Sequence, residues 1–482
     1  MPTTGESLAP QRRLPGPSRL AIALLLFAVA NGVLVNVALP HLPWQPQHTT
    51  TLDYTRAYIA RGAHSDSWKP MRTALVFMDE PREKPVYSVL WFDNQVRFQY
   101  PPSSLLVFEA LRLLPMEEPN GNELLNSISW WAIVLLALVV ARIFRLSRKR
   151  YGTGGASRTE ELLFAGLAVL VTLTFYPVVR GYYLGQIQIW IDLLIACVVW
   201  AWLEDRRRAS GALIALICAI KPTLALVVIW AVLRRHWDFV VGFALPMAVF
   251  ALVSLGMYGW TNHVDYLRVL EDISRLGEVF HPNQSMNGLL HRFFENGNSL
   301  EWSRDVFVAY DPWVHAGTVL SSLALVALGL GFGGLGFGGL RLGHRRGGAP
   351  APADSHGPLD PLDPLDLAIV ILCSTLAAPT VWTHHYGVTL PLFALALPAV
   401  LALTRPGQRG LLIAFVAAFM LISNNYRVLN RLAETPFNFL QSYVYFGGLL
   451  LLAVLCLLKH RADAAAQPGS QSSAARASAS LS

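Results

Sequence analysis

The side chains of this sequence that could take part in chemistry lie in short polar segments between long apolar runs. Asp53 follows the first apolar run and could act as a general base if it is partly removed from water. The alternative is an ordinary solvated loop carboxylate. Asp66, Asp79 and Asp93 stand in the same polar stretch and compete for the same role.

Two cations stand where apolar segments end or break. Arg180 lies near Gly185-Gln186, and its guanidinium could hold a phosphate while Gln186 binds a sugar hydroxyl. Lys221 precedes Pro222 inside an apolar segment, so its ammonium needs an anionic partner. That partner is either a lipid phosphate, which we slightly favour, or the intramembrane carboxylate of Asp192.

Amides and a tyrosine mark two further polar segments. Tyr100 comes directly before two prolines, which fix the backbone at the start of a short helix. Asn283, Gln284 and Asn287 lie close together in a later loop, where their amides suit sugar hydroxyls and suit turns equally well.

The histidine pair His384-His385 follows Trp382. Neighbouring side chains on a helix point in different directions, so the pair does not form a bidentate metal site. One of the two could bind a phosphate or transfer a proton, and the other is structural. The four cysteines lie inside apolar runs without metal-ligand spacing, so the sequence predicts no metal and no cofactor.

The composition indicates which kind of scaffold must position these residues. The chain has 482 residues, of which 54% are hydrophobic and 14% are charged, whereas roughly a quarter are charged in soluble domains. Its net charge of +7 could indicate nucleic acid, but the cations cluster beside apolar runs, as in membrane proteins. We therefore predict an all-α polytopic membrane protein that does not bind nucleic acid.

Ten apolar runs are predicted to cross the membrane: 20–38, 124–146, 160–178, 184–203, 237–258, 313–341, 365–379, 384–403, 407–424 and 437–458. Residues 103–114 are too short to cross and predict an interfacial helix. Residues 209–233 are split by Lys221-Pro222 and predict two half-helices. The basic runs all lie on the cytoplasmic side only if this pair enters and leaves on one side, which gives about twelve membrane helices.

This topology divides the chain into three parts. Residues 1–19 form a cytoplasmic N-terminal segment, 20–458 the membrane domain, and 459–482 a disordered cytoplasmic tail. The long loops 39–102 and 259–312 are expected outside, with the candidate residues at the outer ends of the spans. The inner loop 343–364 is rich in Gly, Pro and Asp and is expected to be flexible.

The order of these motifs resembles that of the family-87 glycosyltransferases of the GT-C class, over residues of about 20 to 455. The features that carry the resemblance are an early outer-loop Asp, Tyr-Pro-Pro before a short helix, Gly-Gln at the head of a span, Lys-Pro in a split helix, Asn-Gln-Ser-x-Asn-Gly, and Trp-x-His-His. Each motif alone is weak, and their shared order makes the match specific. Gln188 departs from the asparagine that is usual for the family.

The resemblance implies a GT-C fold with short periplasmic helices between the first spans. It implies transfer of a sugar, such as mannose, from a polyprenyl-phosphate-linked donor to a lipid or glycan acceptor at the outer face of a bacterial inner (plasma) membrane. By position, Asp53 would be the base of an inverting reaction. Lys221, Arg180, His384, His385 and Gln186 would bind the sugar donor and its phosphate, and Tyr100, Asn283, Gln284 and Asn287 the acceptor or sugar.

Two other function classes fit the same membrane scaffold. A transporter or lipid flippase could use the same cavity for a lipid-linked sugar, although no second broken segment matches 209–233. A non-catalytic protein could bind the lipid-linked sugar without reaction. Only an enzyme would consume the sugar donor.

Overall fold

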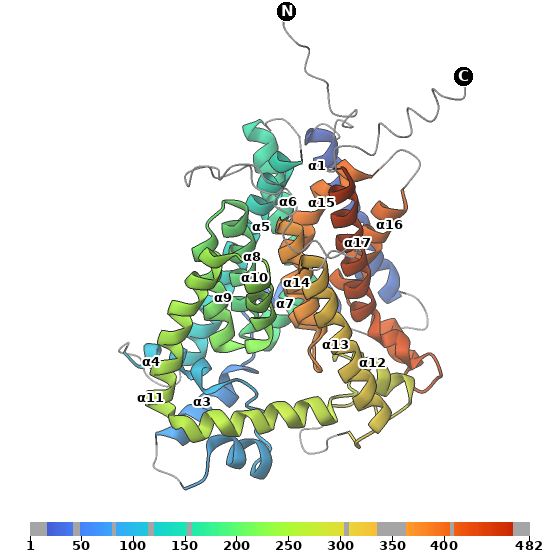
Figure 1. Ribbon diagram of the computed structural model, residues 1–482. Helices are drawn as coiled ribbons and strands as arrows, with labels where there is room; N and C mark the ends of the chain where they lie inside the picture. Colours follow the sequence, from blue (N-terminus) through green and yellow to red (C-terminus); the bar gives the residue numbers. More distant parts are fainter. Residues whose placement is uncertain are drawn as a thin grey trace, which may run out of the picture.

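The computed structural model describes residues 17–41, 49–79, 83–113, 120–151, 157–302, 308–334, 363–404 and 409–465 (Figure 1). Within these ranges the chain forms helices and no strands. Residues 343–362 of the loop predicted at 343–364 lie outside the described residues, as does the tail beyond residue 465, whereas 363–364 are helical.

The α-helices differ widely in length. They are α1 (Pro17–Val33), α2 (Thr51–Ile59), α3 (Trp68–Met78), α4 (Leu106–Arg112), α5 (Asn120–Arg150), α6 (Arg158–Leu173), α7 (Tyr176–Leu184), α8 (Gln188–Leu203), α9 (Arg207–Ile220), α10 (Leu226–Leu233), α11 (Trp237–Leu276), α12 (Met286–Phe293), α13 (Pro312–Gly334), α14 (Asp363–Leu376), α15 (Thr389–Leu403), α16 (Gly410–Ser423) and α17 (Tyr443–Ala465). Short 3₁₀ or π turns connect them: η1 (Leu34–Ala38), η2 (Leu39–His41), η3 (Ser88–Asp93), η4 (Pro102–Leu105), η5 (Pro222–Ala225), η6 (Thr383–Val388), η7 (Arg427–Leu432) and η8 (Asn438–Ser442).

Six of the described helical stretches are long and apolar enough to cross a membrane: Ser18–His41, Gly121–Arg150, Trp237–Leu276, Pro312–Gly331, Thr383–Leu403 and Asn438–Ala462. The pair α6 and α7, bent by 55°, adds a seventh if it is one span. Several shorter apolar helices pack among them, including α8 and α14. The predicted class, an all-α polytopic membrane protein, is confirmed, and the count of about twelve membrane helices stays a prediction.

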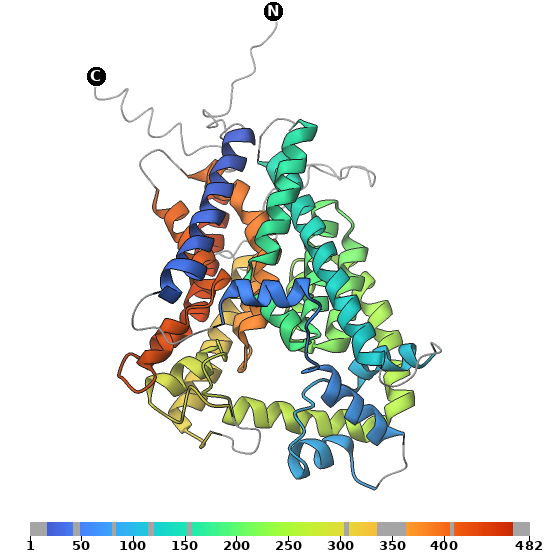
Figure 2. The same cartoon turned by 180° about the vertical axis from the view of Figure 1, so that it is seen from behind.

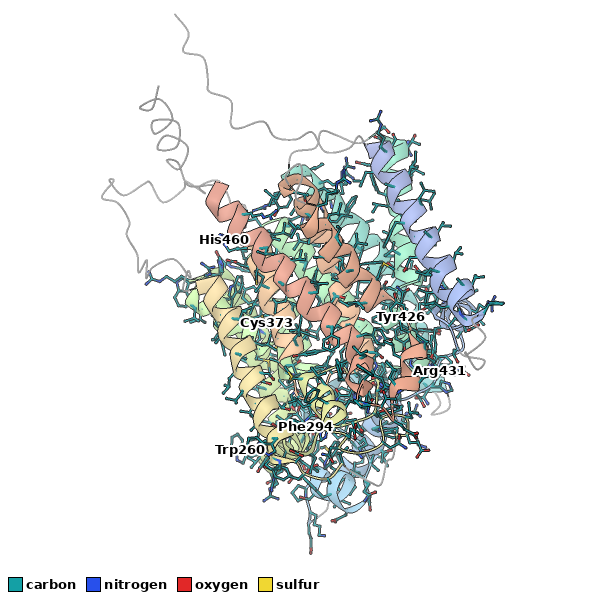
Figure 3. The ribbon with its side chains drawn as sticks, turned by 90° about the vertical axis from the view of Figure 1, so that its right-hand side faces the viewer. Trp260, Phe294, Cys373, Tyr426, Arg431 and His460 are labelled. Carbon is teal, nitrogen blue, oxygen red and sulfur yellow. The ribbon has the colours of Figure 1, made fainter. Side chains whose placement is uncertain are left out.

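The long helices run side by side, and a layer of short helices closes one end of the bundle (Figure 1; seen from behind in Figure 2). α11 joins the two parts, because it runs along the bundle and then turns at Gly259 to lie across that end. Gly259 has a φ of +72°, a value that favours glycine. Figure 3 shows the same arrangement from the side: Trp260 and Phe294 lie toward one end, His460 lies at the other, and Cys373 lies between them.

The predicted break at Lys221-Pro222 is present. α9 ends at Ile220, Lys221 is extended, and the chain resumes with η5 and α10. Proline lacks the backbone N–H that would continue the helix, which explains why the break falls there. The predicted short helix over 103–114 is also present, as η4 and α4.

Three element boundaries differ from those predicted. Residues 179–183, which separate the predicted spans 160–178 and 184–203, lie inside α7, because Pro177 starts a new short helix after the bend. The expected loop after residue 258 continues as helix to Leu276. α17 continues to Ala465, so the first residues assigned to a disordered tail are helical.

Charged residues at the end opposite the short-helix layer pair with one another. Asp366 of α14 lies 2.5 Å from Arg234 at the end of α10 and 3.4 Å from Lys459 of α17. The three side chains bring together two basic segments, 234–236 and 459–461, which the predicted topology assigns to the cytoplasmic side of the membrane.

Candidate functional site

A cavity of about 700 Å³ lies within the short-helix layer, where this layer meets the ends of the bundle helices. Its lining comes from six separate parts of the chain: the α2–α3 connection with α3, the segment from η3 to Tyr100, α7 with Gln186, the end of α11 through Pro282, Trp302, and η6 with the residues before it. This volume is typical of ligand sites, which measure about 300–1,000 Å³.

One wall of the cavity is built by docking the α2–α3 connection onto the end of α7. The backbone N–H of His64 donates to Tyr183 O at 2.8 Å, and the N–H of Asp66 donates to Leu184 O at 2.9 Å. Gly185 caps α7 with a φ of +68°, and a Cβ there would lie 2.0 Å from His64 O. Glycine is therefore required for the two backbones to approach this closely.

This docking places Asp66 against Gln186. Gln186 Nε2 donates to Asp66 Oδ2 at 2.6 Å, and Gln186 Oε1 accepts from the Ser67 hydroxyl at 2.7 Å. Ser67 also lies 3.0 Å from the Tyr100 hydroxyl, and Tyr100 OH is thereby tied to the same buried cluster. Asp66, Gln186 and Tyr100 all line the cavity.

Burial raises the pKa of the Asp66 carboxyl above its ordinary value of 3.8, although the hydrogen bond from Gln186 and the charges of Arg180 and His64 act in the opposite direction. A carboxylate with a raised pKa is a stronger base than one in water. Because effective general bases have a pKa nearer the working pH, this environment suits proton removal.

Arg180 and His384 add a guanidinium and an imidazole to the same cavity. Arg180 of α7 donates to the Tyr54 hydroxyl of α2, and its guanidinium carbon lies 5.0 Å from the centre of the Tyr54 ring. His384 of η6 packs against α7, since a Cβ on Gly181 would lie 3.4 Å from His384 Cβ. Two side chains that can bind a phosphate therefore lie in one cavity with the Asp66 carboxylate and the Gln186 amide.

A second wall carries carboxylates and indoles from α11, the segment after it, and η3. Asp272 Oδ2 accepts from Trp91 Nε1 at 2.8 Å. Glu278 Oε1 accepts from the Phe280 N–H at 3.1 Å, and Arg97 and Trp302 complete this wall. None of these residues belongs to a motif that sequence reasoning singled out.

The sequence of the chain over residues 98–353 matches the family model described as glycosyltransferase family 87. The chain belongs to glycosyltransferase family 87. The matched residues include Arg180, Gln186 and Glu278 of the cavity, whereas Asp66 precedes them and His384 follows them.

Two curated relatives carry the name polyprenol-phosphate-mannose-dependent alpha-(1-2)-phosphatidylinositol pentamannoside mannosyltransferase. The relative from Mycobacterium tuberculosis is 25% identical over 67% of this chain and 63% of its own length. The relative from Mycolicibacterium smegmatis is 24% identical over 64% of this chain and 62% of its own length. The chain thus spans less than two thirds of the length of each relative it matches.

Within this family-87 chain, the structure places Asp53 outside the lining of the cavity. Asp53 is the third residue of α2 and forms a capping box with Thr50, whose N–H donates to Asp53 Oδ2 at 2.7 Å. Its Oδ1 lies 3.2 Å from Arg56, and 38% of its side chain is exposed. Burial alone would raise the pKa of Asp53, but the bonds from Thr50 and Arg56 lower it below its ordinary value.

Asn283, Gln284 and Asn287 are buried, and their amides bond to surrounding backbone. Gln284 Nε2 donates to His281 O and Gln441 O, and its Oε1 accepts from the N–H groups of two α17 residues. Asn283 Oδ1 accepts from the Val381 N–H at 3.0 Å. These three side chains thus connect neighbouring segments of the chain. None of the three lines the cavity.

Lys221 and His385 lie together, apart from the cavity lining. Lys221 Nζ is 3.0 Å from His385 Nε2 and 3.4 Å from Gln188 Oε1. These three side chains line a separate small void of about 20 Å³. Asp192 accepts from Gln188 at 2.9 Å, so it joins the same buried group. The neighbours His384 and His385 therefore face different spaces, as expected for adjacent residues.

Metal-binding side chains do not cluster in the described part of the chain, where no three His, Cys, Asp or Glu residues lie close enough to hold an ion. The carboxylates of the cavity are instead paired with Gln186, Trp91 and the Phe280 backbone.

Proposed function

We propose that this protein is a membrane glycosyltransferase that moves a sugar from a polyprenyl-phosphate-linked donor to a hydroxyl of a lipid or glycan acceptor. The observation that carries the proposal is the shared cavity, which combines Arg180 and His384 with Asp66 and Gln186. Membership of family 87 supports the reaction class. The names of the two relatives favour mannose as the sugar.

The sugar donor carries a phosphate, and the cavity offers groups that bind one. The guanidinium of Arg180 is held in place by the Tyr54 hydroxyl and ring, so it is pre-positioned for a phosphate oxygen. His384 lies beside α7 and can donate a second hydrogen bond. Such groups stabilise the charge that develops on the leaving phosphate.

The reaction we propose is a single displacement at the anomeric carbon. A carboxylate removes the proton of the acceptor hydroxyl, whose oxygen forms a bond to that carbon. The bond from this carbon to the phosphate oxygen breaks, and the polyprenyl phosphate leaves with the electron pair. One displacement inverts the carbon, so a β-linked donor gives an α-linked product. General-base assistance of this kind contributes typically about 10²–10⁴-fold.

The geometry favours Asp66 as this base. Asp66 lines the cavity, its pKa is raised by burial, and the hydrogen bond from Gln186 fixes the direction of its carboxylate. Gln186 can at the same time contact the substrate through the cavity. Asp66 was one of the residues that competed with Asp53 in the sequence.

Asp53 is the second candidate for the general base. It is supported by the family resemblance, because it follows the first predicted span. Its side chain is partly exposed, but both carboxylate oxygens are bonded to Thr50 and Arg56. Asp53 is not part of the cavity lining, and its Oδ1 would have to leave Arg56 before it could accept a proton. The variants Asp66→Asn and Asp53→Asn therefore distinguish the two candidates, because only the change at the true base should abolish most of the sugar transfer.

The site is proposed to face the exterior of a bacterial plasma membrane. The basic last turn of α5, with Arg148, Lys149 and Arg150, supports a cytoplasmic location for that end of the helix. The chain must cross the bilayer between this turn and the short-helix layer that holds the cavity (Figure 1). Polyprenyl phosphate in the outer leaflet would then reach the cavity from the side.

The proposal is tested with purified protein in lipid nanodiscs, supplied with polyprenyl phosphate mannose labelled in the sugar and with lipids extracted from the producing bacterium. We expect the label to move from the acid-labile polyprenyl phosphate linkage to an acid-stable product. A transporter or a binding protein would leave all label on the polyprenyl phosphate, and that result would overturn the proposal.

A further inference from the structure

The second wall of the cavity has a composition that the proposed reaction does not use. Asp272 and Glu278 supply two carboxylates, and Trp91 and Trp302 supply two indoles. Arg97 is the one cation that we place in this wall, and its charge acts on Glu278. The wall therefore carries more negative than positive groups, in contrast to the region around Arg180 and His384.

The backbone at Glu278 is fixed from both sides. Asn287 Oδ1 accepts from the Glu278 N–H at 3.0 Å, and Asn283 Nδ2 donates to Glu278 O at 2.7 Å. Gly277 has a φ of +71°, and a Cβ there would lie 2.0 Å from Asn287 Oδ1. The Asn-Gln-Ser-Met-Asn-Gly segment thus sets the position of this carboxylate.

Asp272 is fixed in a different way, through its side chain. The indole N–H of Trp91 donates to Asp272 Oδ2 at 2.8 Å, which orients the carboxylate and the ring together. The Arg97 guanidinium carbon lies 5.5 Å from the centre of the same Trp91 ring. Trp302, with 46% of its surface exposed, adds a second indole to the lining.

These groups match the chemistry of an uncharged saccharide. Carboxylates accept hydrogen bonds only, so they pair well with neighbouring hydroxyls of a sugar ring. Indole faces are large apolar surfaces that suit the C–H face of such a ring. A phosphate or carboxylate on the ligand would instead meet Asp272 and Glu278 as like charges, which disfavours it.

We infer that the wall formed by Trp91, Arg97, Asp272, Glu278 and Trp302 binds the acceptor, and that the acceptor presents an uncharged saccharide to this wall. The inference rests on the proposed function, because it assigns the second substrate of that reaction. It adds the acceptor class, and it gives roles to five residues outside the sequence motifs.

The test compares two matched acceptors in nanodiscs, with polyprenyl phosphate mannose as the sugar donor. Octyl α-mannoside presents a neutral sugar, and octyl α-mannoside 6-phosphate presents the same ring with an anion. We expect kcat/KM for the neutral acceptor to exceed that for the phosphorylated one at least ~10-fold, as for one unfavourable interaction with a charged group. Octyl β-glucoside and octyl β-galactoside extend the neutral series.

Variants then assign the effect to the wall. Asp272→Asn and Glu278→Gln are expected to raise the acceptor KM by about 10- to 100-fold, the usual effect of losing a hydrogen bond to a charged group. The KM for the sugar donor is expected to stay unchanged, which also shows that each variant is folded. Glu271→Gln and Glu301→Gln are the controls, because these neighbours are exposed and do not line the cavity.

Two results would overturn the inference while leaving the proposed function intact. One is a change confined to the sugar-donor KM in Asp272→Asn and Glu278→Gln. The other is a preference for the phosphorylated acceptor, or no turnover and no inhibition by any neutral glycoside, in a preparation that transfers label to extracted lipids. Failure of the proposed function itself is distinct, since no preparation would then consume the sugar donor.

Discussion

Gln186 donates to the Asp66 carboxylate over 2.6 Å, although 120 residues separate the two in sequence. The contact joins the connection before α3 to the turn between α7 and α8, and Gly185 makes it possible because only glycine lets His64 approach α7 so closely. A carboxylate is thereby held beside the guanidinium of Arg180 in one cavity. The proposed function depends on this contact.

The first prediction separates the two candidate bases. Asp66→Asn should lower kcat by about 10²–10⁴-fold, because the amide cannot accept the proton. Asp53→Asn should leave kcat within a few-fold and weaken the α2 cap by about 1 kcal/mol. Transfer rates of the purified variants, with thermal unfolding as the measure of stability, give both values. The reverse pattern would assign the base to Asp53.

The second prediction concerns pH. Burial raises the pKa of Asp66, so the deprotonated, active form is lost on acidification at a higher pH than for an ordinary aspartate. On the acidic limb of the pH profile, kcat should therefore fall with a midpoint above pH 3.8, the ordinary pKa of an aspartate. If Asp53 were the base, its lowered pKa would move the limb below that value. The residual activity of Asp66→Asn should lack the limb.

A third prediction addresses the close approach at Gly185. Gly185→Ala forces a Cβ into the His64 carbonyl and strains a residue with a φ of +68°, which costs on the order of 1–3 kcal/mol. We expect a lower midpoint of thermal unfolding and a loss of transfer, because Asp66 moves away from Gln186. Gly166→Ala in α6 is the matched control, since its added Cβ would lie within 4 Å of no atom beyond its chain neighbours and the backbone of α6 itself. Equal behaviour of the two variants would contradict this role.

Arg180 should act on the sugar donor. Arg180→Gln removes the charge that we assign to the phosphate, and the KM for polyprenyl phosphate mannose should rise about 10- to 100-fold. Arg180→Lys should recover part of this loss, because the charge returns without the planar fork. Arg206→Gln, at the α8–α9 turn, is the control. A donor KM that does not change in Arg180→Gln would show that the phosphate binds elsewhere.

Much of the scaffold could be predicted from sequence because apolar runs and prolines act locally. Three features depend only on residues a few positions away: the break at Lys221-Pro222, the short helix after Tyr100, and the end of a predicted span at Gly259. The helix from Trp260 to Leu276 was missed, since its charged residues resembled those of a loop. In the structure Asp272 lines the cavity, Asp265 is buried and accepts from the Ser88 N–H, and Glu271 is exposed.

The site was only partly predictable, because its geometry depends on distant contacts. Arg180, Gln186 and His384 were identified, and the structure brings them into one cavity. Asp272 and Glu278 were not, since a carboxylate in a long polar interval carries no local signal of its partner. Amides such as Gln284 suit both turns and sugars, and only the bonds to α17 reveal which backbone groups it holds.

The most direct measurement is the fate of labelled polyprenyl phosphate mannose with the wild-type protein, Asp66→Asn and Asp53→Asn in nanodiscs that contain extracted lipids. We expect acid-stable labelled product with the wild-type protein and with Asp53→Asn, and at least ~100-fold less with Asp66→Asn. Label that stays on polyprenyl phosphate with the wild-type protein, or an Asp66→Asn variant as active as the wild-type protein, would contradict this expectation.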